Sequence, residues 1–193
     1  MEYPHFYCQL DYEHIPFPSP TSPKGNLANN GCGPISASMI IENMLKIDFP
    51  PEESAKLAKA CGAREGFGTN FYIFQEGLIE RFGLTITNTE DYDEMLDFLK
   101  QKKGMVVANT YGDREDYVGV FSDGGHYVAV IGMEGEEVMV LDPMYKQGSD
   151  RFEKPGRKEK VRLSGNVAYA NPLVLKDDCR ERPFFLFYWP EEK

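Results

Sequence analysis

Cys32 stands in a setting that suits a reactive thiol. It is flanked by Gly31 and Gly33, and the turn-forming pair Asn30-Gly31 delivers the chain to it. From Gly33 to about Lys46 the apolar residues recur at helical spacing, which predicts that Cys32 lies at a helix N-terminus. Unpaired amides at such an end favour a thiolate, and a neighbouring imidazolium brings a thiol pKa to roughly 3.5–7.5. The chemistry indicated is nucleophilic attack on a carbonyl, with the Cys32 amide available to an oxyanion.

Taken alone, Cys32 is better explained as a small buried hydrophobic residue, which is what most cysteines are. The second half of the chain changes this balance, because a histidine and a carboxylate occur there with informative spacing. The segments HYVAVIG and EVMVLD have the composition of two strands, and the short segment between them has a glycine. They are predicted to form a β-hairpin.

The predicted loop of this hairpin is Met133-Glu134-Gly135, which pairs residues whose numbers sum to 268. Val130 then faces Val138, and His126 faces Asp142. Opposed side chains in an antiparallel pair have Cβ atoms about 4.5–5.5 Å apart. The register therefore predicts an imidazole beside a carboxylate.

A carboxylate that accepts one ring N–H of His126 fixes the tautomer and leaves the other nitrogen facing a nucleophile. A slip of one residue would move one of the two side chains to the opposite face of the sheet. The alternatives are a strand-end histidine and a turn-forming Asp142-Pro143 pair. Their opposition across one hairpin favours the functional interpretation.

The elements that must position these residues follow from the periodicity. Further helices are predicted over 51–61, 70–82 and 91–103, and the last two have apolar residues that face inward. After Gly104 the chain becomes rich in runs of β-branched, apolar and aromatic residues. These runs predict strands at MVVAN, HYVAVIG, EVMVLD, KVRL, VAYA and FFLFYW. Helices first and strands second indicate an α+β fold in which the nucleophile helix packs against an antiparallel sheet.

The remaining segments are expected to be irregular. The first thirty residues are rich in proline, so they are predicted to be an extended lead-in without a regular helix. The polar, glycine-punctuated stretch 111–125 is expected to be a surface loop. No boundary or repeat interrupts the pattern, which predicts a single domain over residues 1–193.

Composition limits the possible partners. The net charge of −10 repels phosphate backbones, so nucleic acid is not expected as a partner. The same charge weakly favours neutral or basic substrates. No apolar run is long enough for a membrane span. One basic segment departs from this pattern and could bind an anion, although a solvated loop and edge strand is the favoured interpretation: Lys154, Arg157, Lys158, Lys160 and Arg162.

No cofactor or metal is expected. His5, His14 and Cys8 occur close together in sequence, but three ligands in one loop do not form a convincing metal pattern. Cys8, Cys61 and Cys179 are expected in or near the core, with reduced thiols and a cytoplasmic location as the default. The N-terminus lacks the plan of a signal peptide, and secretion stays open if an export signal precedes these residues.

The segments YCQLDY, NNGCGPISASMI, GGHYVAVIG and VLDP, in this order, resemble the papain-like cysteine peptidases. The branch concerned is similar to the double-glycine leader peptidases of bacteriocin exporters, and the weaker segment GFGTNFYIF extends the resemblance to residues 5–145. It implies a papain-like fold, Cys32 as nucleophile, His126 as general base and Asp142 as the residue that orients it. Gln9 is implied to complete the oxyanion hole, a role that rests on the resemblance alone.

Two departures separate the chain from the exporter peptidases. More than twenty residues separate Gln9 from Cys32, and Gly31 stands where those enzymes have an aspartate, so the chain is more similar to free-standing members. The resemblance implies hydrolysis of a peptide or small amide through a thioester. An acyltransferase or transamidase using the same site is the first alternative, and a catalytically silent binding domain is the second. The substrate and the oligomeric state stay open.

Overall fold

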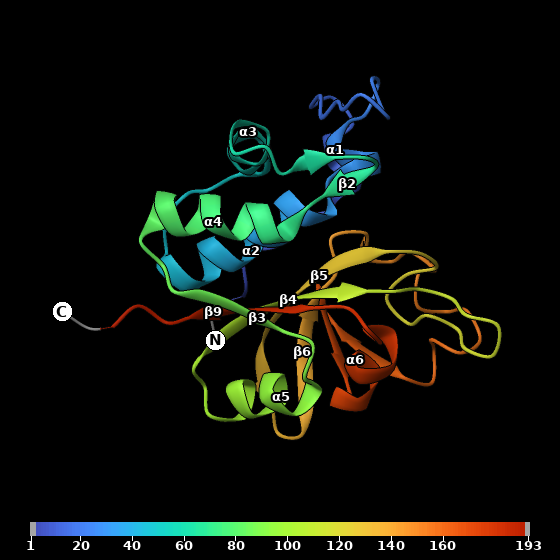
Figure 1. The fold of residues 1–193 in the computed structure, drawn as a ribbon. Helices are drawn as coiled ribbons and strands as arrows, with labels where there is room; N and C mark the ends of the chain where they lie inside the picture. Colours follow the sequence, from blue (N-terminus) through green and yellow to red (C-terminus); the bar gives the residue numbers. More distant parts are fainter. Residues whose placement is uncertain (1–2, 192–193) are drawn as a thin grey trace.

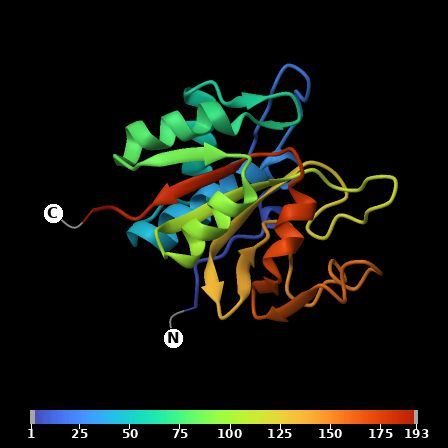
Figure 2. The same cartoon turned by 60° about the horizontal axis from the view of Figure 1, so that its bottom comes forward.

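A computed structural model describes residues 3–191 of the chain. A helical layer covers one face of a seven-stranded antiparallel sheet, and two further helices lie against the other face (Figures 1 and 2). The α+β class is confirmed. The single domain predicted over residues 1–193 stays a prediction, and its first two and last two residues lie outside the described part.

The helices of the described chain are η1 (Gln9–Tyr12, a 3-10 turn), α1 (Leu27–Asn30), α2 (Cys32–Leu45), α3 (Pro51–Ala60), α4 (Phe71–Phe82), α5 (Tyr92–Lys100) and α6 (Pro172–Asp178). The strands are β1 (Arg64–Glu65), β2 (Gly68–Thr69), β3 (Ile86–Thr89), β4 (Gly104–Thr110), β5 (His126–Glu134), β6 (Glu137–Leu141), β7 (Val161–Ser164), β8 (Val167–Ala170) and β9 (Phe184–Tyr188). The large sheet has the order β3-β9-β4-β5-β6-β8-β7, and β1 and β2 form a separate small ribbon.

The central strands are apolar on both faces because helices cover both. In β4, Val107 belongs to the cluster beneath α2, α3 and α4, whereas Val106 and Ala108 belong to the cluster against α5 and α6. Strand residues alternate between the two faces, so a strand buried on both sides has a nearly continuous apolar run. This explains why the C-terminal segments were recognisable as strands.

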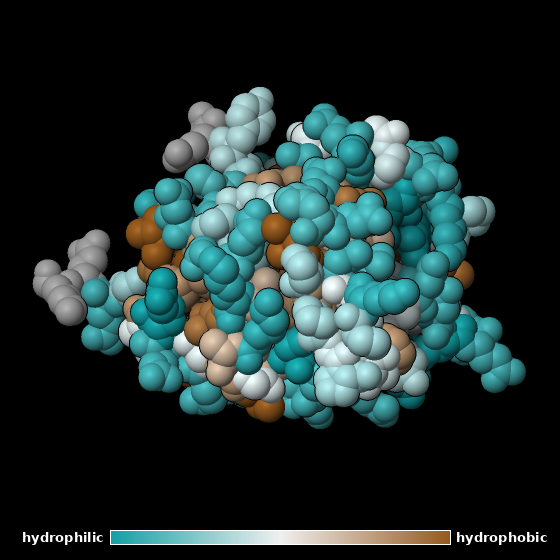
Figure 3. All heavy atoms as spheres, turned by 90° about the horizontal axis from the view of Figure 1, so that it is seen from above, coloured by the Kyte–Doolittle hydropathy of each residue, from teal (hydrophilic) through white to brown (hydrophobic). Residues whose placement is uncertain are grey.

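Helix α2 is buried almost all the way round, not only along the predicted stripe. Every residue from Gly33 to Met44 is buried. The sheet lies below the helix and α3 packs beside it, while the small ribbon approaches its N-terminus. A Cβ added at Gly33 would lie 2.9 Å from Cβ of Thr69 in β2, so only glycine allows this close approach. The outer face of the helical layer is mostly hydrophilic, with apolar residues in small separate patches (Figure 3).

The predicted register of the β5–β6 hairpin is wrong. Val130 pairs with Val140, not with Val138. Near the turn the strands are joined by only two residues, Gly135 and Glu136, and Gly135 takes a positive φ of 59°. The sequence pattern did not show how far β5 extends into the glycine-containing segment.

A bulge in β5 brings His126 and Asp142 to the same face of the sheet, as predicted. The register shifts between Val130 and Gly132, which leaves an extra residue in β5. Beyond the bulge, paired numbers sum to 270 instead of 268, because Ala129 faces Leu141. An offset of two leaves side chains on the same face of the sheet. His126 and Asp142 are therefore diagonal neighbours on one face and not directly opposed residues.

Several short elements were not predicted. The lead-in contains η1 and the single helical turn α1, capped by Asn26, because both fall where prolines are absent. Strand β3 is short and polar, and it is held as an edge strand by pairing with β9. Helix α6 does carry a signal, since Asn171 caps it and Pro172 occupies its first turn. The stretch 111–125 is a loop, but Val120 and Phe121 within it are fully buried.

Phe71 ties the helical layer to the strand that carries His126. Its ring is 1% exposed and lies 4.7 Å from the ring of Phe185 and 5.2 Å from that of Tyr127, between centroids. We expect Phe71→Ala to lower the free energy of unfolding by about 3–5 kcal/mol, because a large buried ring leaves a cavity. Urea unfolding measures the loss. Ile73→Ala, on the same helix but 37% exposed, is the control and should lose much less; equal losses would contradict the packing described.

Candidate active site

A cleft of about 500 Å³ opens where the N-terminus of α2 meets β5. Cys32, His126 and Gln9 line it, and Asp142 lies directly behind His126. The structure thus brings all four predicted site residues together. Their catalytic roles stay predictions.

Cys32 is the first residue of α2 and is only partly buried. Burial acts to raise its pKa, but a side-chain hydrogen bond with His126, the charge of that ring and the backbone amides of Tyr127 and Gly33 outweigh burial. The pKa of the Cys32 thiol is therefore lowered from its ordinary value. Ionisation of the sulfur is favoured by partners on two elements, α2 and β5.

His126 begins β5 and is held between the sulfur and a carboxylate. Its Nε2 lies 2.8 Å from Oδ1 of Asp142, and its side chain is also hydrogen bonded to Cys32. Burial acts to lower the His126 pKa, but the negative charge of Asp142 and these hydrogen bonds raise it to about 9. Because Asp142 occupies Nε2, Nδ1 is the ring nitrogen left for the sulfur. The two shifts act in the same sense, because a lowered Cys32 pKa and a raised His126 pKa both favour a thiolate beside an imidazolium.

Asp142 follows β6, and both oxygens of its carboxylate accept hydrogen bonds. The backbone amide of Met144 donates to Oδ1 at 2.9 Å, and Nε of Arg151 donates to Oδ2 at 2.5 Å. Burial alone would raise the pKa of Asp142, but the positive charges of His126 and Arg151 lower it. The carboxylate therefore stays ionised under the imidazole.

Arg151 was missed at the sequence level. It lies in a polar segment with no periodicity, and nothing nearby indicates that its side chain folds back on Asp142. Besides that carboxylate, its guanidinium donates to the carbonyl oxygen of Phe121, in the loop that leads to His126. The only available signal is an arginine within ten residues of the strand-end aspartate, which is weak.

Gln9 is held at the cleft by both its backbone and its side chain. Its backbone amide donates to the carbonyl oxygen of Pro143 at 2.7 Å, and its Nε2 donates to that of Ala28 at 2.8 Å. The residue is only 3% exposed. The side-chain amide has two hydrogens, so one remains for a group bound in the cleft.

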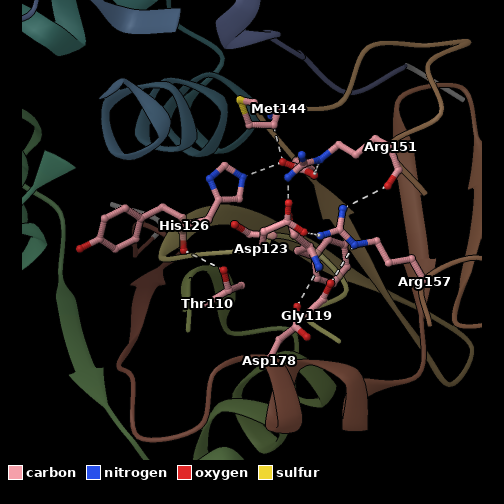
Figure 4. Close-up of polar contacts among 12 residues, drawn as sticks. Thr110, Gly119, Asp123, His126, Met144, Arg151, Arg157 and Asp178 are labelled. Carbon is pink, nitrogen blue, oxygen red and sulfur yellow. Dashed lines mark hydrogen bonds and ion pairs between the residues drawn. The ribbon is translucent and has the colours of Figure 1, made fainter. Parts of the chain in front are cut away.

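The loop before His126 is held by hydrogen bonds to a buried carboxylate. Asp178 of α6 accepts hydrogen bonds from the backbone amides of Val120 and Phe121 at 2.9 and 2.8 Å. Arg157 donates to the carbonyl oxygen of Gly119 at 2.8 Å and is only 4% exposed (Figure 4). The basic segment is therefore not uniformly solvated, because Arg157 is a buried structural residue.

The other histidines and cysteines lie elsewhere. His5 pairs with Glu42 at 3.0 Å, and the ring of His14 stacks on Tyr12. Cys8 and Cys179 are buried, and Cys61 is partly buried. Within residues 3–191, no group of three or more His, Cys, Asp or Glu side chains is arranged to hold a metal ion. Each helix in that range is too short or too polar to cross a membrane.

Residues 6–164 match the sequence model of the Peptidase_C39 like family. Among solved structures, the peptidase domain of Streptococcus ComA, a bi-functional ABC transporter involved in a quorum-sensing pathway, is similar, with a TM-score of 0.53 and 11% identity. That alignment covers 82% of this chain and 91% of the other. A Bacillus anthracis protein assigned as a C39-like peptidase gives a TM-score of 0.50 and 16% identity over 94% of this chain and 97% of its own. No curated protein matches the sequence.

Removal of the Arg151 guanidinium should weaken the fold near neutral pH. We expect Arg151→Gln to lower the free energy of unfolding by about 1.5–3 kcal/mol at pH 7, the usual contribution of a hydrogen bond to a charged group. The pKa of Asp142 is lowered in the folded state, so its ionised form stabilises the protein above its unfolded pKa of about 3.9. The stabilisation is lost as the pH falls through the folded pKa.

The difference in stability between Arg151→Gln and the parent should therefore shrink in acid. Chemical denaturation at a series of pH values measures it. Arg162→Gln is the control, because Arg162 makes an exposed ion pair with Glu137 and should change stability little. A difference that stays constant as the pH falls through the folded pKa of Asp142 would show that Arg151 acts by packing and not through the Asp142 charge.

Proposed function

Because the chain belongs to the Peptidase_C39 like family, we propose that it is a cysteine peptidase in which Cys32 attacks a peptide carbonyl. The observation that carries the proposal is the hydrogen-bonded series Cys32, His126 and Asp142 at the wall of a cleft. A thiolate beside an imidazolium is a competent nucleophile next to a ready proton donor.

In the acylation step the Cys32 thiolate adds to the carbonyl carbon and the carbonyl oxygen becomes an oxyanion. The free hydrogen of the Gln9 side-chain amide and the backbone amide of Cys32, the first of its helix, donate to that oxygen. His126 then gives its proton to the leaving nitrogen as the C–N bond breaks. The products of this step are a free amine and a thioester on Cys32.

In the deacylation step His126, now neutral, accepts a proton from a water molecule that attacks the thioester. The C–S bond breaks, an acid product leaves, and the thiolate and imidazolium are restored. Asp142 keeps its hydrogen bond to Nε2 throughout, so the ring stays in one orientation and its charged form is stabilised. Arg151 and the Met144 amide hold that carboxylate in place.

The first test is the reactivity of individual cysteines. We expect iodoacetamide at pH 6 to alkylate Cys32 much faster than Cys61, because the pKa of Cys32 is lowered and the thiolate is the reactive form of cysteine. Cys61 is partly exposed and serves as an internal control in the same sample. Mass spectrometry of the two cysteine peptides measures both rates. If Cys32→Ala reacts as fast as the parent, Cys32 is not the nucleophile.

The pH dependence of peptide hydrolysis should show a plateau. Activity rises as the pH passes the lowered pKa of Cys32, and it falls as His126 loses its proton near pH 9. The Asp142 charge helps raise the His126 pKa, so Asp142→Asn should move the alkaline fall to lower pH as well as reduce the rate. Measurement of kcat/KM from pH 4 to pH 10 tests this. If the alkaline fall in kcat/KM occurs at the same pH in Asp142→Asn as in the parent, the Asp142 charge does not raise the His126 pKa.

Gln9 should act on the oxyanion and not on the sulfur. We expect Gln9→Ala to reduce kcat for amide hydrolysis by roughly 10²–10³-fold, as removal of an oxyanion donor does. Alkylation of Cys32 by iodoacetamide forms no oxyanion, so its rate should change little. Circular dichroism and the alkylation rate together show whether the site is still assembled. Equal losses in hydrolysis and alkylation would mean that Gln9 only supports the fold.

A further inference from the structure

The charged side chains on the wall of the cleft are Asp123, His126, Arg151 and Arg182. Two of the cations, His126 and Arg151, share the carboxylate of Asp142, and His126 is also bound to the Cys32 sulfur. Their charges are matched within the site by Asp142 and by the thiolate. They offer little attraction for a further anion.

Asp123 is also neutralised by the protein. Nζ of Lys154 and Nη2 of Arg157 each lie 2.6 Å from its Oδ1. Arg182 differs, because no carboxylate of residues 3–191 lies within ion-pair distance of its guanidinium. The cleft therefore presents one cation whose charge is not matched by the described chain.

The backbone and a tyrosine ring orient Arg182. It follows Glu181, which adopts an uncommon positive φ of 59°, and its own amide donates to the carbonyl oxygen of Cys179 at 2.9 Å. Its guanidinium lies over the ring of Tyr111, 5.0 Å from the centroid. A side chain that is partly buried and stacked loses less conformational freedom when it binds an anion.

Arg182 is joined to the strand that carries His126 through β4. The backbone amide of Asn109 in β4 donates to the carbonyl oxygen of Pro183, the residue after Arg182, at 3.3 Å. Asn109 in turn pairs with Tyr127, the neighbour of His126 in β5. Arg182 thus shares one wall of the cleft with the strand that carries the imidazole.

A further polar group lies on the cleft wall. Asn109 lines the cleft together with Arg182. Its side-chain amide can donate a hydrogen bond to an oxygen of a bound molecule. Asn109 therefore suits a ligand with acceptor oxygens.

We propose that Arg182 forms a subsite for a carboxylate of the substrate, either an Asp or Glu side chain or a terminal carboxylate. This rests on the proposed function, and it departs from the neutral or basic substrates favoured by the overall charge. The two effects act over different distances. At physiological salt the charges of the distant surface are screened beyond about 8 Å, whereas a guanidinium in direct contact with a carboxylate is little screened. The local arginine therefore decides which substrate is bound.

Peptide libraries with Asp or Asn, and Glu or Gln, at each position test the first source of the carboxylate. The same peptides with a C-terminal acid or amide test the second. We expect the parent to cleave the acidic member of one pair with a roughly 10- to 100-fold higher kcat/KM, the range of one charge-assisted hydrogen bond. Arg182→Glu should abolish or invert that ratio, and Arg182→Lys should retain part of it.

Arg180→Glu is the matched control. It makes the same charge change two residues away, and Arg180 is exposed and does not line the cleft. It should leave the ratio unchanged. Equal ratios in the parent and Arg182→Glu, or the same shift in Arg180→Glu, would overturn the subsite.

The subsite can be tested even if the protein does not hydrolyse peptides. If the parent cleaves none of the peptides, the proposed function fails, and binding of the same peptides to Cys32→Ala by fluorescence anisotropy still tests the subsite. Tighter binding of the acidic members, lost in Cys32→Ala with Arg182→Glu, supports it. Equal binding of acidic and amide peptides would overturn it, whatever the fate of the enzymatic proposal.

Discussion

The carboxylate of Asp142 lies beneath the imidazole with its side chain fully buried, and it receives N–H groups from three parts of the chain. A buried charge is costly unless it is paired and hydrogen bonded. His126 and Arg151 supply the positive charge, and the Met144 amide supplies the third donor. The ionised site is therefore stable only when β5, the end of β6 and the segment around Arg151 are assembled together.

Contacts around Asp142 also hold the lead-in and the loop before β5. The backbone of Gln9 is bound to Pro143, the residue next to the buried carboxylate. On the other side, Arg151 reaches the carbonyl oxygen of Phe121, whose amide is held by Asp178 of α6. The contact of Gln9 joins residues more than a hundred positions apart, and the contacts of Phe121 with Arg151 and Asp178 span 30 and 57 positions. The geometry of the cleft thus depends on tertiary structure and not on any local motif.

Sequence patterns predicted the main helices and the six strands that follow Gly104, because burial on fixed faces forces the periodicity that reveals them. They predicted the wrong register for β5 and β6, since a bulge and a turn residue leave no clear trace. His126 and Asp142 still lie on one face because the pairing sum beyond the bulge, 270 instead of 268, is shifted by an even number. Arg151 and Arg182 were not found, because their partners are distant and a surface arginine has the same local sequence.

Helix α2 is enclosed along its length, by the sheet on one side and by other helices and the ribbon on the others. Interiors of this kind are close-packed and resist displacement, so the sulfur at its first residue has a nearly fixed position. Any adjustment to the shape of a bound peptide must then come from the rim, where Phe67, Gly124 and Gly125 lie on irregular segments. Changes in specificity between relatives should accordingly accumulate in the rim and leave the helix that bears the nucleophile unaltered.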